Sequence, residues 1–195
     1  MQLIFVRHGE TDSNKKGTYL GWTDVELNEE GIRQAQCVNA KLTGIKIDAI
    51  YSSPLKRVRE TADIINDHYD LDIIYENALM ERNFGIWDDL TFKEITEGFK
   101  EEYDLWVKDW VNYCIKDGES ASQVYGRLSA FLQNLIDSKK EGTYLIVTHL
   151  GCIRMAVAYL LGLQIEDSWR FKVDNCCVTK IEISDGYGVL TQLNG

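Results

Sequence analysis

Two of the chain's three histidines stand directly behind short apolar runs. His8 follows Leu3–Val6 and Arg7, and His149 follows Tyr144–Thr148. Apolar runs of this length are typical of buried strands, and open parallel sheets bind ligands beyond the carboxyl ends of their strands. One such histidine is as often a hydrogen-bonded core residue as a functional one. Two that converge on one crevice favour a shared site.

Arginines accompany these histidines. Arg7 precedes His8, and Arg57 follows a third apolar run, Ile47–Tyr51. The chain carries a formal net charge of -10, which repels nucleic acid, so cations that converge in one crevice require an anionic ligand. Phosphate accepts paired hydrogen bonds from guanidinium groups. The sequence therefore predicts a phosphate pocket that contains imidazole.

A neutral histidine in such a pocket can attack phosphorus and become a phosphohistidine. The departing alcohol then needs a proton, which a carboxylic acid can supply. Glu81 is the candidate acid, because the apolar residues Met80, Phe84 and Trp87 around it would exclude water. Without the other candidate residues, Glu81 could equally be an ordinary glutamate in a surface loop.

In their order along the chain, these residues resemble the signature of the histidine phosphatase superfamily, which includes the cofactor-dependent phosphoglycerate mutases. Its Arg-His-Gly motif matches Arg7, His8 and Gly9, and the match extends along the whole chain. The resemblance implies that His8 is the phosphorylated nucleophile and Glu81 the proton donor that later activates water. It also implies further catalytic and phosphate-binding or substrate-binding residues, namely Arg7, Asn14, Gly21, Arg57, His149 and Leu150, the last standing where many relatives have glycine.

Within the superfamily, Asn83–Asp88 and Trp169–Cys177 look like the corresponding segments of alpha-ribazole phosphatases. That likeness implies hydrolysis of alpha-ribazole 5'-phosphate to alpha-ribazole and phosphate, in the assembly of the cobalamin nucleotide loop. Alternatives are a broad-specificity phosphatase, a phosphoglycerate mutase-like enzyme acting on sugar phosphates, and a non-catalytic module that binds phosphorylated ligands. The chain lacks the long insertions that such mutases carry between the acid and the second histidine, which favours hydrolysis.

Strand and helix patterns alternate and predict a three-layer α/β/α fold with a mainly parallel sheet and an antiparallel edge, as in phosphoglycerate mutase-like proteins. We expect strands at Leu3–Val6, Ile47–Tyr51, Leu71–Tyr75, Tyr144–Thr148, Val178–Ile183 and Gly188–Leu193, the last two joined by a turn at Asp185-Gly186. We expect helices between Asn28 and Gly44 with Ile32, Ala35, Val38 and Leu42 buried, from Ser53-Pro54 through Ile65, and over Phe99–Ile115, Ala121–Ser138 and Cys152–Leu161. Residues 1–195 are expected to form a single histidine phosphatase domain, with a helical substrate-side insertion at about 83–120.

Other features restrict the function class. The five cysteines form no CxxC pair, and the N-terminus resembles no signal peptide, so we expect reduced thiols in a cytoplasmic protein. No apolar run approaches the length of a membrane span. The partner is therefore expected to be a small phosphorylated substrate, with no nucleic acid, membrane, metal or cofactor involved; the oligomeric state is left open.

Five aromatic residues at helical spacing and the third histidine could also contribute to the site. Phe99, Tyr103, Trp106, Trp110 and Tyr113 follow helical spacing and either pack in the core or cover an aromatic leaving group. Core packing is the preferred interpretation for Trp110, whereas Tyr103 and Trp106 are candidates for substrate contact. His68 lies in a polar helix exit and is expected at the surface.

Overall fold

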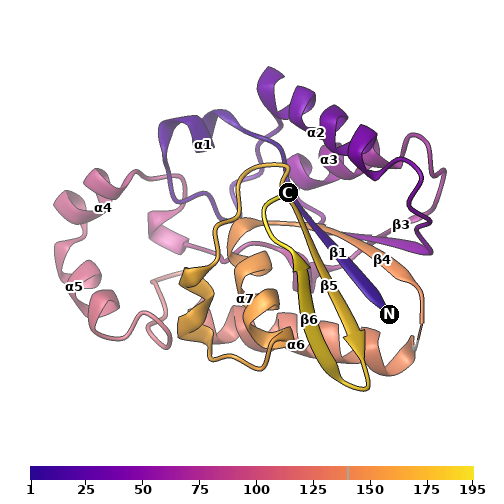
Figure 1. The fold of residues 1–195 in the computed structure, drawn as a ribbon. Helices are drawn as coiled ribbons and strands as arrows, with labels where there is room; N and C mark the ends of the chain where they lie inside the picture. Colours follow the sequence, from indigo (N-terminus) through magenta and orange to yellow (C-terminus); the bar gives the residue numbers. More distant parts are fainter. Residues whose placement is uncertain (140) are drawn as a thin grey trace.

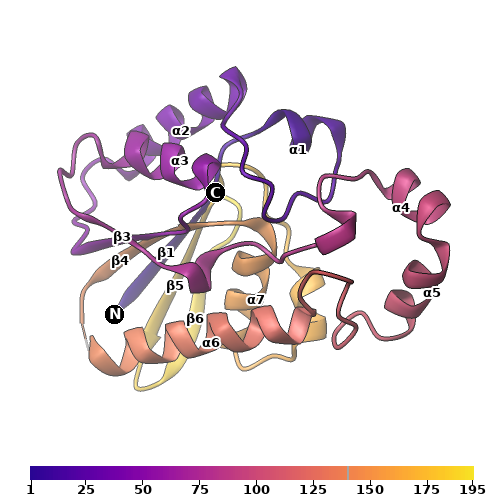
Figure 2. The same cartoon turned by 180° about the vertical axis from the view of Figure 1, so that it is seen from behind.

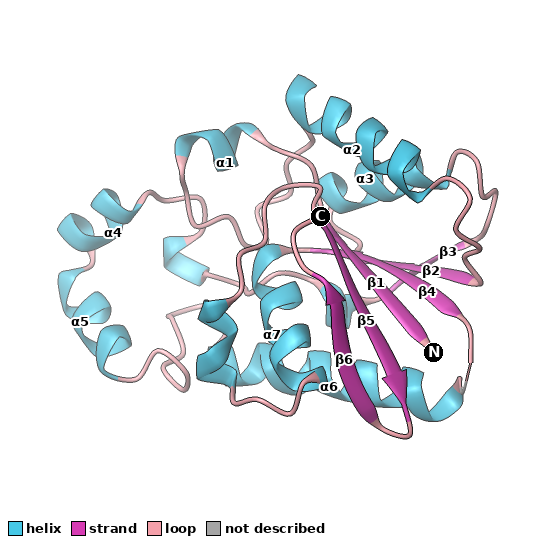
Figure 3. Ribbon diagram, viewed as in Figure 1, coloured by secondary structure: helices cyan, strands magenta, loops and turns pink. Residues whose placement is uncertain are grey.

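A six-stranded sheet in the order β3-β2-β4-β1-β5-β6 lies at the centre of the computed structural model, which describes residues 1–139 and 141–195. Strands β1, β2, β3 and β4 pair in parallel, whereas β5 pairs antiparallel with β1 and with β6. The strands are β1 (Gln2–Arg7), β2 (Ala49–Ser52), β3 (Ile73–Tyr75), β4 (Thr143–Thr148), β5 (Val178–Ser184) and β6 (Tyr187–Gln192). Figure 3 shows the twisted sheet with its strands fanning out from one another.

Helices cover both faces of the sheet (Figures 1 and 2). Helices α2 (Glu29–Leu42) and α3 (Lys56–Asn66) share one core with one face of β1 and β4. Helices α6 (Ala121–Ser138) and α7 (Leu150–Leu160) share the other core with the opposite face. Because both faces are covered, β1 and β4 read as continuous apolar runs rather than alternating ones. The expected three-layer fold is confirmed.

The register of the central strands brings the predicted site residues together. Arg7 pairs with Thr148 and Ser52 pairs with Val147, so β1, β4 and β2 end at one edge of the sheet. Their continuations stay in contact, because His8 N donates to Thr148 O at 3.0 Å. His8 and His149 are thus neighbours across two strands although 141 positions (149 − 8) separate them in the sequence.

The antiparallel edge forms at the expected turn. Asp185 and Gly186 have φ of 49° and 77°, which is the left-handed pair of a tight hairpin turn. Beyond β3, on the other side, the chain continues through the 3₁₀ turn Asn77–Leu79 towards Glu81.

Two details of the first helices differ from expectation. Helix α2 buries Gly31, Ala35, Val38 and Leu42, so Ile32 lies one position off this stripe and is 42% exposed. Gly31 takes the inner position because the backbone of Glu10 approaches closely there; a Cβ would lie 2.2 Å from the Glu10 oxygen. Asn28 caps the helix as predicted, accepting from Gly31 N.

Helix α3 begins at Lys56, two residues after the predicted Ser53-Pro54 start, and its cap position is Leu55. The Ser53 hydroxyl oxygen is shared between His149 Nε2 at 2.9 Å and Leu55 N at 3.4 Å, so it does not bond to an amide inside the helix. The predicted start of this helix is therefore wrong by two residues.

The predicted helix Phe99–Ile115 is wrong in extent. The structure has α4 (Phe92–Gly98) and α5 (Lys100–Lys108), after which the chain is not helical up to Ser120. Asp109 ends the helix, since its carboxylate accepts from Asn112 N and so competes with helical hydrogen bonds. The start of α4 at Thr91 carried a signal in the sequence, a capping box with Glu94.

Helices α4 and α5 lie to one side of the three layers (Figure 1). They belong to the segment for which a helical insertion is expected, and they pack on a small separate core of Trp87, Ile95 and Ile115. Short helix α1 (Asp12–Lys16) lies between this segment and α2. Within residues 1–139 and 141–195, none of the helices has the length and apolarity needed to cross a bilayer.

Candidate active site

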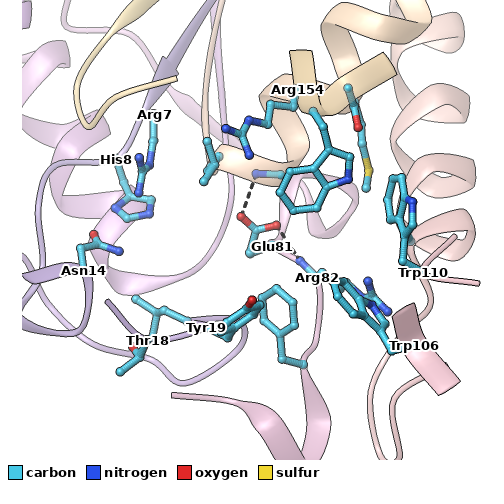
Figure 4. A pocket seen from close by; sticks show the side chains of 18 residues that line it. Arg7, His8, Asn14, Thr18, Tyr19, Glu81, Arg82, Trp106, Trp110 and Arg154 are labelled. Atoms are coloured by element: carbon cyan, nitrogen blue, oxygen red, sulfur yellow. Dashed lines mark hydrogen bonds between the residues drawn. The ribbon is translucent and has the colours of Figure 1, made fainter. Parts of the chain in front are cut away.

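A cavity of about 290 Å³ opens where β1 and β4 end (Figure 4). Five of the predicted site residues line it: Arg7, His8, Asn14, Glu81 and Leu150. The other three, Gly21, Arg57 and His149, lie outside this lining, and the last two are fully buried. The site therefore consists of a set that faces the cavity and a set behind it.

His8 is held as a neutral ring with one defined tautomer. Its Nδ1 lies 2.7 Å from Gly9 O, and because a carbonyl can only accept, Nδ1 must carry the hydrogen. Nε2 is then left with a lone pair. Burial, followed by the nearby Arg57 and Arg7 charges, lowers the pKa of His8 well below its ordinary value. The neutral, nucleophilic form is therefore the stable one at neutral pH.

Gly9 permits this arrangement. A Cβ at this position would lie 2.4 Å from Gly31 O at the start of α2, so only glycine allows the loop after β1 to approach that helix. The Gly9 amide donates to Thr61 Oγ1 on α3 at 3.1 Å. The carbonyl that orients His8 is thus fixed by two helices.

His149 and Arg57 form a buried pair behind His8. Arg57 Nη2 donates to His149 Nδ1 at 3.2 Å, so His149 Nε2 carries the hydrogen and donates to Ser53 Oγ at 2.9 Å. The His149 ring meets the His8 ring edge-on, with centroids 5.2 Å apart. Burial and the Arg57 charge lower the pKa of His149 well below its ordinary value, so this ring is also neutral.

Arg57 is held by the carbonyls of the loop that contains Gly21. Its Nη2 donates to Gly21 O at 2.7 Å and its Nη1 to Thr23 O at 3.0 Å. Asp88 in turn accepts from the amides of this loop, with Gly21 N at 2.7 Å and Trp22 N at 2.8 Å. Burial lowers the pKa of Arg57 to about 10, so the guanidinium keeps its charge at neutral pH.

Two buried guanidinium nitrogens still lack a protein partner. Within the described residues, Arg7 Nε and Arg57 Nε have no hydrogen-bond acceptor, although Arg7 Nη1 donates to Val173 O at 3.0 Å. A buried N–H without a partner is costly in free energy. Arg7 lines the cavity beside His8, so its Nε is suited to an oxygen of a phosphoryl group, whereas Arg57 lies outside that lining.

Asn14 extends the polar side of the cavity. It is the third helical residue after the cap Thr11, and its Oδ1 accepts from Thr11 N at 3.2 Å. Because the oxygen is taken, the NH₂ group of Asn14 is the group free to donate towards a ligand. In Figure 4, Arg7, His8 and Asn14 lie together on one side of the cavity.

Glu81 lies beside these groups and is oriented by main-chain donors. Its Oε2 accepts from Gly151 N at 3.0 Å and its Oε1 from Arg82 N at 2.9 Å, as the dashed lines in Figure 4 mark. Its own carbonyl accepts from Arg127 Nη2 and from Trp22 Nε1. The carboxyl is buried, but backbone amides position it, whereas the sequence pattern suggested an enclosure of apolar side chains.

Two of these partners were missed by the sequence analysis. Gly151 places the first turn of α7 against the carboxyl, and the His-x-Gly sequence at the predicted strand end was an available signal. Arg127 on α6 is paired with Glu119 at 3.0 Å and also donates to Ala78 O. No sequence signal separates it from a surface arginine on an amphipathic helix.

The other side of the cavity is largely aromatic. Tyr19, Phe84, Trp106, Trp110 and Trp169 line it, and Figure 4 shows Trp106 and Trp110 on the side opposite Arg7 and His8. Arg154 stands in the same wall, 5.4 Å from the centre of the Trp169 ring.

The aromatic series thus divides between wall and core. Trp110 packs against the core, as predicted, but it also lines the cavity, where it meets the Trp169 ring edge-on at a centroid distance of 5.6 Å. Trp106 lines the cavity, whereas Tyr103 lies outside the lining and packs on the small core beside Trp87. His68 is exposed as expected.

In the part of the chain that the structure describes, no group of three or more His, Cys, Asp or Glu side chains is arranged to hold a metal ion.

Comparisons with known proteins agree with this geometry. The model of the histidine phosphatase superfamily (branch 1) matches residues 3–195. Phosphoserine phosphatase 1 of Hydrogenobacter thermophilus is 32% identical over 194 residues, covering 100% of this chain and 92% of that protein. The adenosylcobalamin/alpha-ribazole phosphatase of Escherichia coli is 30% identical over 194 residues, covering 100% and 96%.

The crystal structure of the alpha-ribazole phosphatase from Shigella flexneri superposes with a TM-score of 0.95 at 30% identity, covering 100% of this chain and 96% of that one. The resemblance seen in the sequence is thereby confirmed, and so is its implication of phosphatase activity. The chain belongs to the histidine phosphatase superfamily and is a phosphoric monoester hydrolase.

Proposed function

We propose that this enzyme hydrolyses a small phosphate monoester through a phosphohistidine on His8. The observation that carries the proposal is the bond from His8 Nδ1 to Gly9 O, which leaves the Nε2 lone pair free in a cavity shared with Glu81. Nε2 forms a bond to phosphorus as the bond from phosphorus to the alcohol oxygen breaks. Glu81 in its acid form gives its proton to that oxygen.

The second half of the reaction uses the same two groups. Glu81, now a carboxylate, takes a proton from water while the water oxygen bonds to phosphorus. The bond from phosphorus to Nε2 breaks, phosphate leaves and His8 returns to its neutral form. Because Gly151 N and Arg82 N hold both carboxyl oxygens, the acid and the base act from one fixed position.

The transferred group is an anion, and its charge must be matched. Arg7 Nε and the Asn14 NH₂ group supply donors at the cavity. Arg57 and His149 act from behind His8, where the Arg57 charge stabilises the phosphoryl group and His149 holds the guanidinium in place. Gly21 contributes through its carbonyl on Arg57, and Leu150 lines the cavity next to Gly151.

The aromatic wall favours a substrate whose alcohol carries a planar ring. Trp106, Trp110 and Trp169 together offer faces and edges on which such a ring can pack. This supports alpha-ribazole 5'-phosphate as the substrate, in keeping with the name of the Escherichia coli relative. Phosphate would bind at His8 and the benzimidazole at the tryptophans.

One observation supports a second candidate. Arg154 lines the same cavity and lies close enough to Glu81 for their charges to interact. A guanidinium in this wall would also suit the carboxylate of phosphoserine, the substrate named for the Hydrogenobacter relative. Phosphoserine is thus the alternative within the same reaction class.

A substrate panel separates the two. We expect kcat/KM to be highest for alpha-ribazole 5'-phosphate, followed by phosphoserine, with 3-phosphoglycerate and fructose 2,6-bisphosphate lower. Replacing Trp106 or Trp110 by leucine should reduce kcat/KM for alpha-ribazole 5'-phosphate about tenfold and leave phosphoserine nearly unaffected, because only the former has a ring to stack. Arg154→Met should do the reverse. Higher kcat/KM for phosphoserine, lost in the Arg154 variant, would assign the enzyme to phosphoserine.

A further inference from the structure

The loop between the 3₁₀ helix Ile165–Arg170 and β5 returns to the end of β1. Cys176 N donates to Arg7 O at 3.1 Å, which ties this loop to the backbone of the nucleophile strand. Beside it, Asn175 Nδ2 makes two contacts, to His8 O at 3.1 Å and to Asn14 Oδ1 at 3.2 Å. A residue 167 positions from His8 in sequence thus touches both the nucleophile's carbonyl and a cavity-lining side chain.

The contact to Asn14 decides which way the Asn14 amide faces. Asn14 Oδ1 accepts from Thr11 N and from Asn175 Nδ2. A side-chain amide whose oxygen serves two donors must turn its NH₂ group the other way. That group is then available at the cavity, on the side where Arg7 and His8 lie.

Without Asn175, one of the two donors on Asn14 Oδ1 is lost, and the flipped amide becomes accessible. The flipped form would present an oxygen, instead of two hydrogens, to the phosphoryl group. An oxygen facing an anion is repelled, whereas an N–H donates a charge-assisted bond. The difference between the two orientations therefore acts directly on phosphate affinity.

We propose that Asn175 is a positioning residue, which fixes the donor face of Asn14 toward the phosphoryl group. The inference rests on the proposed function, because it assumes that phosphate binds between Asn14 and His8. Asn175 acts through Asn14 and does not itself touch the substrate.

A double-mutant cycle tests this. In Asn175→Ala, we expect the inhibition constants of orthovanadate and inorganic phosphate, and KM for p-nitrophenyl phosphate, to rise about tenfold, with a smaller fall in kcat. In the Asn14→Ala background, the same substitution should change these constants less than about twofold, since the side chain it orients is gone. Equal effects in both backgrounds would overturn the proposal, as would unchanged phosphate affinity in the single variant.

A second variant guards against a general loosening of the loop. Asn175→Asp keeps the size of the side chain but cannot donate, so it should weaken phosphate binding at least as much as Asn175→Ala while the melting temperature stays close to that of the parent. Asn194→Ala is the matched control, because Asn194 Oδ1 anchors the same loop at Asp174 N without contacting His8 or Asn14. A similar loss of phosphate affinity in Asn194→Ala would show that only loop rigidity matters.

The proposed function can fail separately. If the parent enzyme neither binds orthovanadate nor hydrolyses any phosphate monoester, the proposed function itself is wrong. If the parent enzyme is active and is inhibited by phosphate, but Asn175→Ala has the same effect with and without Asn14, only the role proposed for Asn175 is wrong.

Discussion

Gly151 N donates to Glu81 Oε2 at 3.0 Å, and a Cβ added at Gly151 would lie 2.5 Å from Glu81 Oε1. The first turn of α7 therefore both holds the carboxyl and leaves it room. Gly151 is within the helix and has no positive φ, so the backbone itself accepts alanine. The added methyl can only be accommodated by moving the flexible end of Glu81.

We accordingly expect Gly151→Ala to fold normally but to lower kcat about 10²-fold, the cost typical of moving a catalytic group by about 1 Å. Steady-state kinetics and thermal melts would measure both. Gly126→Ala on α6 is the matched control, since a Cβ there meets nothing within 4 Å, and it should keep full activity with equal or higher stability. Full activity in Gly151→Ala would mean that Glu81 does not need this position.

The second prediction concerns the nucleophile. His8→Ala should lower turnover by at least about 10³-fold, because no other neutral imidazole nitrogen faces the cavity within the described residues. Quenching the parent enzyme during turnover of a radiolabelled monoester should trap an acid-labile phosphohistidine that is absent from His8→Ala. His68→Ala, which removes an exposed histidine, should trap as much label as the parent. Label on serine, cysteine or aspartate would exclude the proposed intermediate.

The third prediction separates Glu81 as an acid from other roles. Glu81→Gln should slow the first step about 10²–10⁴-fold for alkyl phosphates, whose alcohols need a proton to leave. The step should be much less affected for p-nitrophenyl phosphate, because p-nitrophenolate leaves without one. The burst of released alcohol measures this step apart from hydrolysis of the phosphoenzyme. Glu97→Gln on the exposed side of α4 is the control, and an equal loss with both substrates would assign Glu81 to a purely structural role.

Much of the site could be predicted because its signals are local. A buried strand, an abrupt Arg7-His8-Gly9 ending and a second histidine after another strand are readable without knowledge of the fold. The parallel pairing of β1 with β4 then brings the two histidines together. These features concern strand ends, which a mainly parallel sheet gathers at one edge.

The sequence does not predict which site residues face the cavity and which are buried behind it. Arg57 lies behind His8 because carbonyls of Gly21 and Thr23 hold it there, and those loop positions depend on Asp88 in a distant segment. The aromatic wall joins side chains from four separate stretches of chain. The helix break at Asp109 depends on an exposed side-chain contact, from Asn112 N to the Asp109 carboxylate. Such effects arise from tertiary contacts that a periodic pattern does not contain.

The last prediction is a dependence of stability on pH. The pKa values of His8 and His149 are both lowered well below the ordinary value, first by burial and then by the Arg57 charge. As pH falls through about 6.5, these histidines take up protons in the unfolded chain but not in the folded one. The unfolded state then binds more protons, so the free energy of unfolding falls as the pH falls, by about 1 kcal/mol per histidine between pH 6.5 and 5.5.

Urea unfolding at pH 7.5, 6.5 and 5.5 would measure this, with an expected combined loss of about 2 kcal/mol between pH 6.5 and 5.5. His149→Gln should remove about half of the slope, since glutamine can donate to Ser53 Oγ and accept from Arg57 without titrating. Carboxylates with a lowered pKa, such as Asp174, change the free energy of unfolding only at lower pH, so they do not affect the range from pH 7.5 to 5.5. A free energy of unfolding that stays constant from pH 7.5 to 5.5 would show that the two rings are not held neutral, and the lone pair proposed for His8 Nε2 would lose its physical basis.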